Sequence, residues 1–556
     1  MKHTRCSSRR SAPQRLPARG WLFVLVLSGM LGTPTLLNAQ SLSWLGALRE
    51  LSRPPTYEFG GGSLFAYDPA LQEGISPEQW ARIMQGIADY HARYGYSFHP
   101  AGGPAPYPFY PQAGNLWRDL ATLYVDLDPV SGSVLDWDCT DYAIDGSTGQ
   151  TSFLRTFNYG EQDIGVPVYA ALDGVVVFTM DGYADYNASC QEDPLGNSVV
   201  LWHGGAHYSI YAHLRNGSVA VAVNQTVRAG QQLGLTGSSG CSRLPRLYFE
   251  SAYGDPLTPY EPHAGTCRPG QSYWVNQVPI RRDMSLWDFN MTDVLIANYP
   301  GLPYDMPRTG TFLSSAPFVS WWIVLVNLPA NSTWRVRFLY PDGTLAFNSG
   351  NRNFGNNVPY STAWWWWRYN LNPNIVGTWR VQLFINNQLM MDAPFKVVAT
   401  QPEIVNRPPF AIEAAAFDPP RPGAGDAIFC RLNTSVLVDD PDYDLVRYRY
   451  TWRVNGNTVR QETIAAHSDA IPWGIYQPGD LLECEITPFD GQADGPSLVV
   501  RIVPGDMNGD GCVDDADLLT VLFAFGSDDP DADANRDGIV DDADLLMALF
   551  AFGEGC

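Results

Sequence analysis

The C-terminal residues carry a repeated pattern of oxygen donors that suits calcium. Two twelve-residue segments, 506–517 and 533–544, lie 27 residues apart and share one spacing. Each has Asp or Asn at positions 1, 3, 5, 9 and 12 and Gly at position 6, where calcium-binding loops turn sharply. Position 7 would supply a backbone carbonyl. The predicted ligands of two calcium ions are Asp506, Asn508, Asp510, Cys512, Asp514 and Asp517, and Asp533, Asn535, Asp537, Ile539, Asp541 and Asp544.

Both loops continue into apolar segments, 518–525 and 545–552, which are expected to be helices. With these helices, residues 504–556 resemble dockerin domains, which are tandem EF-hand-type modules. The resemblance implies that the duplicated helix faces bind a cohesin-like protein, with contacts at Asp515, Ala516, Asp542 and Ala543. The alternative is a calcium-stabilised terminal module without such a partner.

The charge of the chain is concentrated in the same module. The formal net charge is −23, and residues 504–556 hold thirteen Asp and one Glu against one Arg. This acidic balance argues against nucleic acid as a main partner. Much of the acidity is therefore explained as ligand chemistry rather than as a bulk property of the protein.

Residues 131–275 alternate short β-branched runs with glycine-containing turns, which predicts an antiparallel β domain. Five stretches (165–176, 196–204, 211–214, 227–240 and 246–250), with 141–146 upstream of them, resemble the lysostaphin/LytM family of zinc endopeptidases. That family cuts peptide cross-links in peptidoglycan. The resemblance implies the same fold and a cleft on its sheet.

The resemblance also implies which residues occupy the three zinc-ligand positions. They fall on Asp141, Asp145 and Tyr248, and only Asp145 keeps the residue type of the family. A later register would move the first two positions to Ser147 and Thr151. Either set lacks imidazole and matches zinc poorly, so we expect zinc catalysis to be lost.

The two assisting histidines of the family fall on His213, which is kept, and on Arg246, which is not. His213 is either a remaining transition-state stabiliser or a hydrogen-bonded strand histidine. Arg246 either holds a carboxylate of a peptide stem or pairs with Asp141 or Asp145. His203 and His207 are the remaining candidates for replacement ligands.

The rest of the chain predicts export and further β domains. Residues 1–39 read as a signal peptide, 40–130 as a mixed extension with a helix capped at Ser76, and 276–307 as a linker. Residues 308–398 and 401–503 are expected to be β-sandwiches, the second Ig-like with Trp452 packed on a Cys430–Cys484 disulfide. The other neighbouring cysteine pairs are 139–190, 241–267 and 512–556.

Two further patterns have open interpretations. The run of four tryptophans at 364–367 would put two on each face of a strand, where the outer pair either packs at a domain interface or forms a sugar-stacking platform. The acidic run 439–444 is either a turn or a further calcium site.

The sequence as a whole predicts a mainly β, multidomain protein secreted to the extracellular space, periplasm or bacterial cell envelope. The mature chain would have no transmembrane segment. Our first hypothesis is a protein with an inactive peptidase-like domain that binds peptidoglycan or an extracellular polysaccharide. The alternatives are an active zinc endopeptidase with non-standard ligands and a dockerin-bearing component of a polysaccharide-degrading or cell-surface complex.

Overall fold

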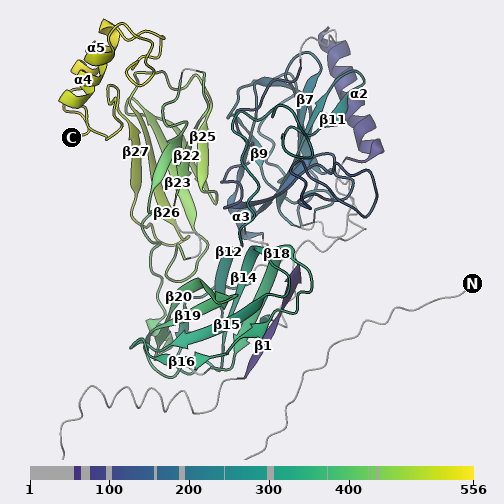
Figure 1. Ribbon diagram of the computed structural model, residues 1–556, viewed down its shortest axis with the longest axis vertical. Helices are drawn as coiled ribbons and strands as arrows, with labels where there is room; N and C mark the ends of the chain where they lie inside the picture. Colours follow the sequence, from purple (N-terminus) through teal and green to yellow (C-terminus); the bar gives the residue numbers. More distant parts are fainter. Residues whose placement is uncertain are drawn as a thin grey trace, which may run out of the picture.

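The computed structural model shows three β bodies and a small helical module at the C-terminal end (Figure 1). The predicted signal peptide lies outside the part of the chain that is described. Within that part, no helix is long and apolar enough to cross a membrane. The prediction of a mainly β, multidomain fold is confirmed. The described residues are 56–63, 75–95, 103–155, 159–186, 195–242, 244–296, 306–371, 373–423, 425–433 and 438–556.

The first body is built on an eight-stranded antiparallel sheet, called the large sheet below. Its strand order is β2-β3-β10-β7-β6-β5-β8, with β11 paired to β10. The strands are β2 (Leu120–Leu123), β3 (Gln150–Leu154), β5 (Gly174–Met180), β6 (Asn197–Trp202), β7 (His207–Leu214), β8 (Thr226–Val227), β10 (Arg246–Tyr253) and β11 (Thr258–Tyr260). A short helix, α3 (Gly160–Ile164), precedes a separate pair, β4 (Pro167–Tyr169) and β9 (Gln232–Leu235).

Both faces of the large sheet are covered. Val168 and Leu233 of the β4–β9 pair belong to the apolar cluster on one face. The other face packs against α2 (Pro77–Tyr94), whose Ile83 and Ile87 join its buried cluster. The predicted helix is thus confirmed. Ser76 caps it through a capping box, and the helix lies along the outer side of this body (Figure 1).

The second body is a β-sandwich, the first sandwich. One sheet has the order β1-β18-β14-β12, and the other has the order β13-β20-β19-β15-β16 with β17 paired to β15. The strands are β1 (Tyr57–Ser63), β12 (Ser285–Thr292), β13 (Thr311–Leu313), β14 (Val319–Leu328), β15 (Thr333–Leu339), β16 (Leu345–Asn348), β17 (Arg352–Asn353), β18 (Tyr360–Tyr369), β19 (Gly377–Ile385) and β20 (Gln388–Val398). Strand β12 lies within the segment 276–307, so that segment is not only a linker.

The tryptophan run lies on β18 and divides between two faces. Trp365 and Trp367 are buried in the core of the first sandwich, where Trp367 stacks on Trp321. Trp364 and Trp366 are partly buried and pack against Trp322, and Trp364 also joins the cluster between this sandwich and the first body. The structure therefore favours packing over an open aromatic platform.

The third body, the second sandwich, docks against the first. Its sheets are β21-β22-β25 and β24-β23-β26-β27, after a 3-10 turn, η2 (Gln401–Glu403). One continuous apolar cluster joins Leu154 and Tyr169 of the first body to Phe429 and Ile471 of this sandwich. The strands are β21 (Ala415–Asp418), β22 (Ile428–Leu432), β23 (Arg447–Val454), β24 (Asn457–Ile464), β25 (Ser468–Ile471), β26 (Leu482–Phe489) and β27 (Leu498–Ile502).

The C-terminal module consists of α4 (Asp515–Ala524) and α5 (Asp542–Phe550), each preceded by one acidic loop. It sits at the end of the second sandwich, as the yellow helices in Figure 1 show. Arg421 of the sandwich forms an ion pair with Asp531 of the module, 2.8 Å apart. A side chain on Gly479 would collide with Met547, so the two parts are in close contact.

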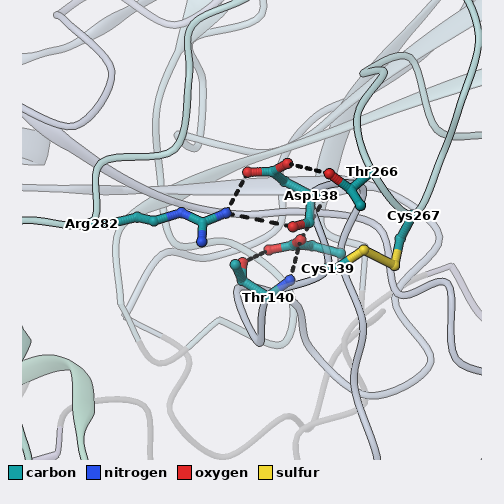
Figure 2. The surroundings of a disulfide bond; sticks show 7 residues. Asp138, Cys139, Thr140, Thr266, Cys267 and Arg282 are labelled. Atoms are coloured by element: carbon teal, nitrogen blue, oxygen red, sulfur yellow. Dashed lines mark hydrogen bonds and ion pairs between the residues drawn. A yellow bond between two sulfur atoms is a disulfide. The ribbon is translucent and has the colours of Figure 1, made fainter.

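The disulfides differ from the sequence-neighbour pairing. Cys139 is bonded to Cys267, 128 residues away, so the predicted pairs 139–190 and 241–267 are wrong (Figure 2). Cys241 is also disulfide-bonded, and Cys190 lies outside the described residues. The predicted Cys512–Cys556 bond is confirmed.

The bond predicted between Cys430 and Cys484 is not present. Both residues are buried free thiols. Trp452 is fully buried and lies opposite Cys484 in the β23–β26 pairing, so the predicted neighbourhood exists without the bond.

Candidate functional site

Strand β10 places three functional side chains on one face of the large sheet. Residues of a strand alternate between faces, so Arg246, Tyr248 and Glu250 point the same way. In the pairing with β3, Tyr248 lies opposite Thr151, which is the residue that the later register assigned to a ligand position. The strand pairing therefore supports the register through Ser147 and Thr151.

Tyr248 belongs to a buried hydrogen-bonded cluster. Its hydroxyl donates to Glu250 Oε2 at 2.5 Å, and the Thr148 hydroxyl donates to the same oxygen at 2.5 Å. A Cβ on Gly149 would lie 2.5 Å from the Tyr248 ring, so the ring occupies the space that a side chain at 149 would need. Glu250 is fully buried, and burial raises the pKa of its carboxyl to about 7.

His213 and Arg246 form the second part of the site. The Arg246 Nη2 group lies 3.0 Å from His213 Nε2 and also donates to the Cys241 carbonyl. Because a guanidinium can only donate, Nε2 accepts, and Nδ1–H donates to the Ser239 carbonyl 2.9 Å away. Burial, followed by the nearby Arg246 charge, lowers the pKa of His213 well below its ordinary value. His213 is therefore a neutral, fully hydrogen-bonded strand residue.

The residues that match a known protein family include most strands of the large sheet. A sequence profile described as Peptidase family M23 matches residues 159–259. The chain is 32% identical to Lipoprotein NlpD of Yersinia enterocolitica over 89 residues, which cover 16% of this chain and 79% of that protein. The chain belongs to peptidase family M23. The M23 domain is the large sheet with the β4–β9 pair.

Two other relatives share only this domain. Peptidoglycan DD-endopeptidase ShyA of Vibrio cholerae is 39% identical over 88 residues, which are 16% of this chain and 17% of ShyA. Murein hydrolase activator EnvC of Escherichia coli is also 39% identical over 88 residues, which are 16% of this chain and 18% of EnvC. The chain thus spans less than a fifth of either relative.

The first two predicted zinc positions lie on the loop before β3. Asp145 accepts hydrogen bonds from the Gly132 N–H and the Ser131 hydroxyl in the loop before β3. Asp141 is exposed on the same loop. Both residues precede the part of the chain that the family profile matches. Arg246 has the contacts with His213 and the Cys241 carbonyl described above.

His203 and His207 do not join this cluster. His203 bonds to the Asp173 carbonyl and the Ser209 hydroxyl, both at 2.7 Å. His207 Nε2 lies 2.9 Å from the Tyr107 hydroxyl. Burial lowers the pKa of His203 to about 4 and that of His207 to about 3. These two residues are neutral core histidines of the M23 domain.

The residues present do not fit a zinc ion. In the register that the β3–β10 pairing favours, the ligand positions hold Ser147, Thr151 and Tyr248, three neutral hydroxyls, whereas catalytic zinc takes imidazole, carboxylate or thiolate ligands. Beside them, Arg246 adds a positive charge and occupies the free nitrogen of His213. Among the described residues, no group of three or more His, Cys, Asp or Glu side chains is placed to hold a metal ion.

Glu250 and Thr148 are the site residues that sequence reasoning missed. Glu250 was visible as an acid two positions after Tyr248 on a strand where its side chain must share that residue's face. Thr148 has no such signal, because its position depends on the path of the loop before β3.

The two loops of the C-terminal module repeat the same hydrogen-bond network. In the first, both Asp506 oxygens accept backbone N–H groups of the loop, and Asp517 accepts from Asn508 and Asp514. Asp544 accepts equivalent bonds from Asn535 and Asp541 in the second loop. Asp517 and Asp544 are fully buried. The predicted calcium ligands of each copy thus share one loop, and calcium binding by these loops stays a prediction.

Proposed function

We propose that the M23 domain has lost zinc catalysis and serves as a non-catalytic module that binds peptidoglycan or another extracellular polymer. The observation that carries this proposal is the replacement of the metal site by two protein-only clusters. The hydroxyls of Tyr248 and Thr148 donate hydrogen bonds to Glu250, and Arg246 donates a hydrogen bond to His213.

The chemistry of the clusters supports loss of hydrolysis. A catalytic zinc lowers the pKa of its bound water to near neutrality through the positive charge of the metal ion. The neutral groups at the three ligand positions do not supply a positive charge that could replace the ion. The relatives include both an endopeptidase and a hydrolase activator, so similarity to this family is compatible with either role.

Three measurements on the purified chain test this proposal. Incubation with purified peptidoglycan should release no soluble muropeptides, and the protein should contain far less than one zinc per chain. The chain should still sediment with peptidoglycan. One zinc per chain together with cleavage that Tyr248→Phe abolishes would overturn the loss of catalysis, and absence of co-sedimentation with peptidoglycan and with polysaccharides would overturn the binding role.

A second role, calcium-dependent docking, is favoured by the surface of the C-terminal module. Phe523 and Phe550, at equivalent positions of the two copies, are 85% and 84% exposed. Three further equivalent pairs are also exposed: Leu519 with Leu546, Leu522 with Leu549, and Phe525 with Phe552. Isolated exposed apolar residues are ordinary, but a duplicated aromatic surface is typical of an interaction site. We infer that this surface binds a cohesin-like partner when both loops hold calcium.

The docking role is tested with recombinant cohesin domains as probes. Binding to immobilised cohesins should require calcium and should be lost with EDTA. The double variant Phe523→Ser/Phe550→Ser should lose binding, whereas Asp528→Ala, an exposed change in the same module, should not. Calcium-independent binding would overturn the calcium dependence, and binding to no cohesin would leave only the terminal-module interpretation.

Export is the third part of the proposal. The signal-peptide pattern of residues 1–39 supports it, and so do the disulfides Cys139–Cys267 and Cys512–Cys556. We therefore place the protein in the extracellular space or the bacterial cell envelope. Cleavage near residue 39, read by N-terminal sequencing of the protein recovered outside the cytoplasm, tests this location.

A further inference from the structure

An acidic cluster lies in the second sandwich, outside the C-terminal loops. It combines the loop between β22 and β23, which carries Asp440 and Asp444, with Asn406 at the entry of the sandwich and Asp490 after β26. Asn406 Nδ2 donates to Asp490 Oδ2 at 2.8 Å, so these two distant residues are in direct contact.

Two oxygens of this cluster are buried without a hydrogen-bond donor among the described residues. Asp440 is fully buried, and its Oδ1 accepts the backbone N–H groups of Asp442 and Asp444 at 2.7 and 3.2 Å. Its Oδ2 has no donor, and neither has the buried Oδ1 of Asn406. A buried carboxylate oxygen without a partner costs free energy that a bound cation would remove.

The acidic groups are only partly balanced by arginine. Asp442 forms an ion pair with Arg407, whose Nη2 lies 2.7 Å from Asp442 Oδ1. Burial raises the pKa of Asp440 to about 7 and that of Asp444 to about 6, and for Asp444 the charges of Asp442 and Asp490 act in the same direction. Arg308 is the cationic group that opposes this shift at Asp444.

We propose that Asn406, Asp440, Asp444 and Asp490 bind one calcium ion. Carboxylate and amide oxygens are ligands that calcium accepts, and calcium tolerates the irregular geometry that loops from three parts of a domain provide. Among the described residues, no group of three or more His, Cys, Asp or Glu side chains is placed to hold a metal ion, so the set depends on the Asn406 oxygen and on side-chain rotations of Asp444 and Asp490.

The position of the site gives the ion a structural consequence. The Asp440–Asp444 loop also contacts the first sandwich: Tyr443 donates its hydroxyl to the Pro394 carbonyl at 2.6 Å, and Asn290 donates to the Tyr443 carbonyl at 3.3 Å. Calcium would tie the entry segment at Asn406 to this loop. The ion would therefore stiffen the joint between the two sandwiches.

Calcium binding to the full chain tests the proposal once the C-terminal loops are disabled. The background variant Asp506→Ala/Asp533→Ala removes the first ligand of both loops, so their behaviour does not affect the result. Equilibrium dialysis with calcium alone should then find one ion per chain. Adding Asp440→Asn should weaken that binding at least about tenfold. Asp494→Asn, in the same sandwich and paired with Arg449, should leave it unchanged.

A second variant protects the test against misfolding. Asn406→Ala removes a ligand oxygen without touching the buried carboxylate, and it should also weaken calcium binding and abolish the rise in melting temperature that calcium causes. A background variant that binds no calcium would overturn the proposal. So would unchanged affinity in both Asp440→Asn and Asn406→Ala, because protonation of Asp440 or a bound water would then explain the unpaired oxygens.

Discussion

Replacing Glu250 by glutamine should change how the stability of the M23 domain depends on pH. The pKa of this buried carboxyl is raised from 4.5 to about 7. A group whose pKa is raised on folding binds its proton more tightly in the folded state, so stability is highest below about pH 4.5 and falls as the pH rises towards 7. At 1.36 kcal/mol for each pKa unit, the loss is at most about 3 kcal/mol, and stability is level above pH 7.

Glu250→Gln keeps an oxygen that accepts from Tyr248 and Thr148 but cannot ionise. The variant should therefore lack the decline between pH 5 and 7 and should melt at a higher temperature than the parent at pH 8. Calorimetry of the full chain at several pH values measures this, with Glu483→Gln, a surface acid paired with Arg501, as the control. A stability difference between parent and Glu250→Gln that is the same at pH 5 and pH 8 would refute a raised pKa at Glu250.

Three further changes have defined outcomes. Asp469→Asn should destabilise the contact between the M23 domain and the second sandwich by about 3 kcal/mol, because the buried Asp469 pairs with Arg460 and accepts a hydrogen bond from the Tyr169 hydroxyl. Limited proteolysis should then cleave the chain faster at this contact. Chelation with EDTA should lower the melting temperature of the C-terminal module and leave that of the M23 domain unchanged, as calorimetry can resolve. Arg246→Ala should raise the pKa of His213 by removing a neighbouring positive charge, which a histidine NMR titration measures.

Patterns that depend on local chemistry could be predicted from the sequence. The helix at 77–94 follows from its capping box and its apolar spacing, and the strands around 175–178 and 199–202 follow from β-branched runs between turns. The duplicated loops of the C-terminal module follow from the spacing of their Asp, Asn and Gly residues alone. In each case the determining residues lie within a few positions of one another.

Features that depend on the meeting of distant segments could not be predicted in this way. Cys139 pairs with Cys267 because the fold brings together the loop before β3 and the segment after β11, which are far apart in sequence. The residues of strand β12 fall in the segment that was expected to be a linker. This strand lies at the edge of its sheet, and its pairing with β14 depends on a segment further along the chain. The register of the first zinc motif likewise depended on how β3 pairs with β10.

Hydrogen bonds between neighbouring side chains explain how the substituted site can be stable without a metal. Removing imidazole ligands from a buried metal site would leave unpaired polar groups, and such groups are costly. Here each substituted residue pairs with a neighbouring side chain: the Tyr248 hydroxyl donates to Glu250, and Arg246 donates to the free nitrogen of His213. Restoring one histidine, at 248 for example, would remove the donor to Glu250 and leave Arg246 in place, so a single reversion should lower stability without creating a zinc site. We therefore expect zinc binding and catalysis to require that several of these side chains be changed together.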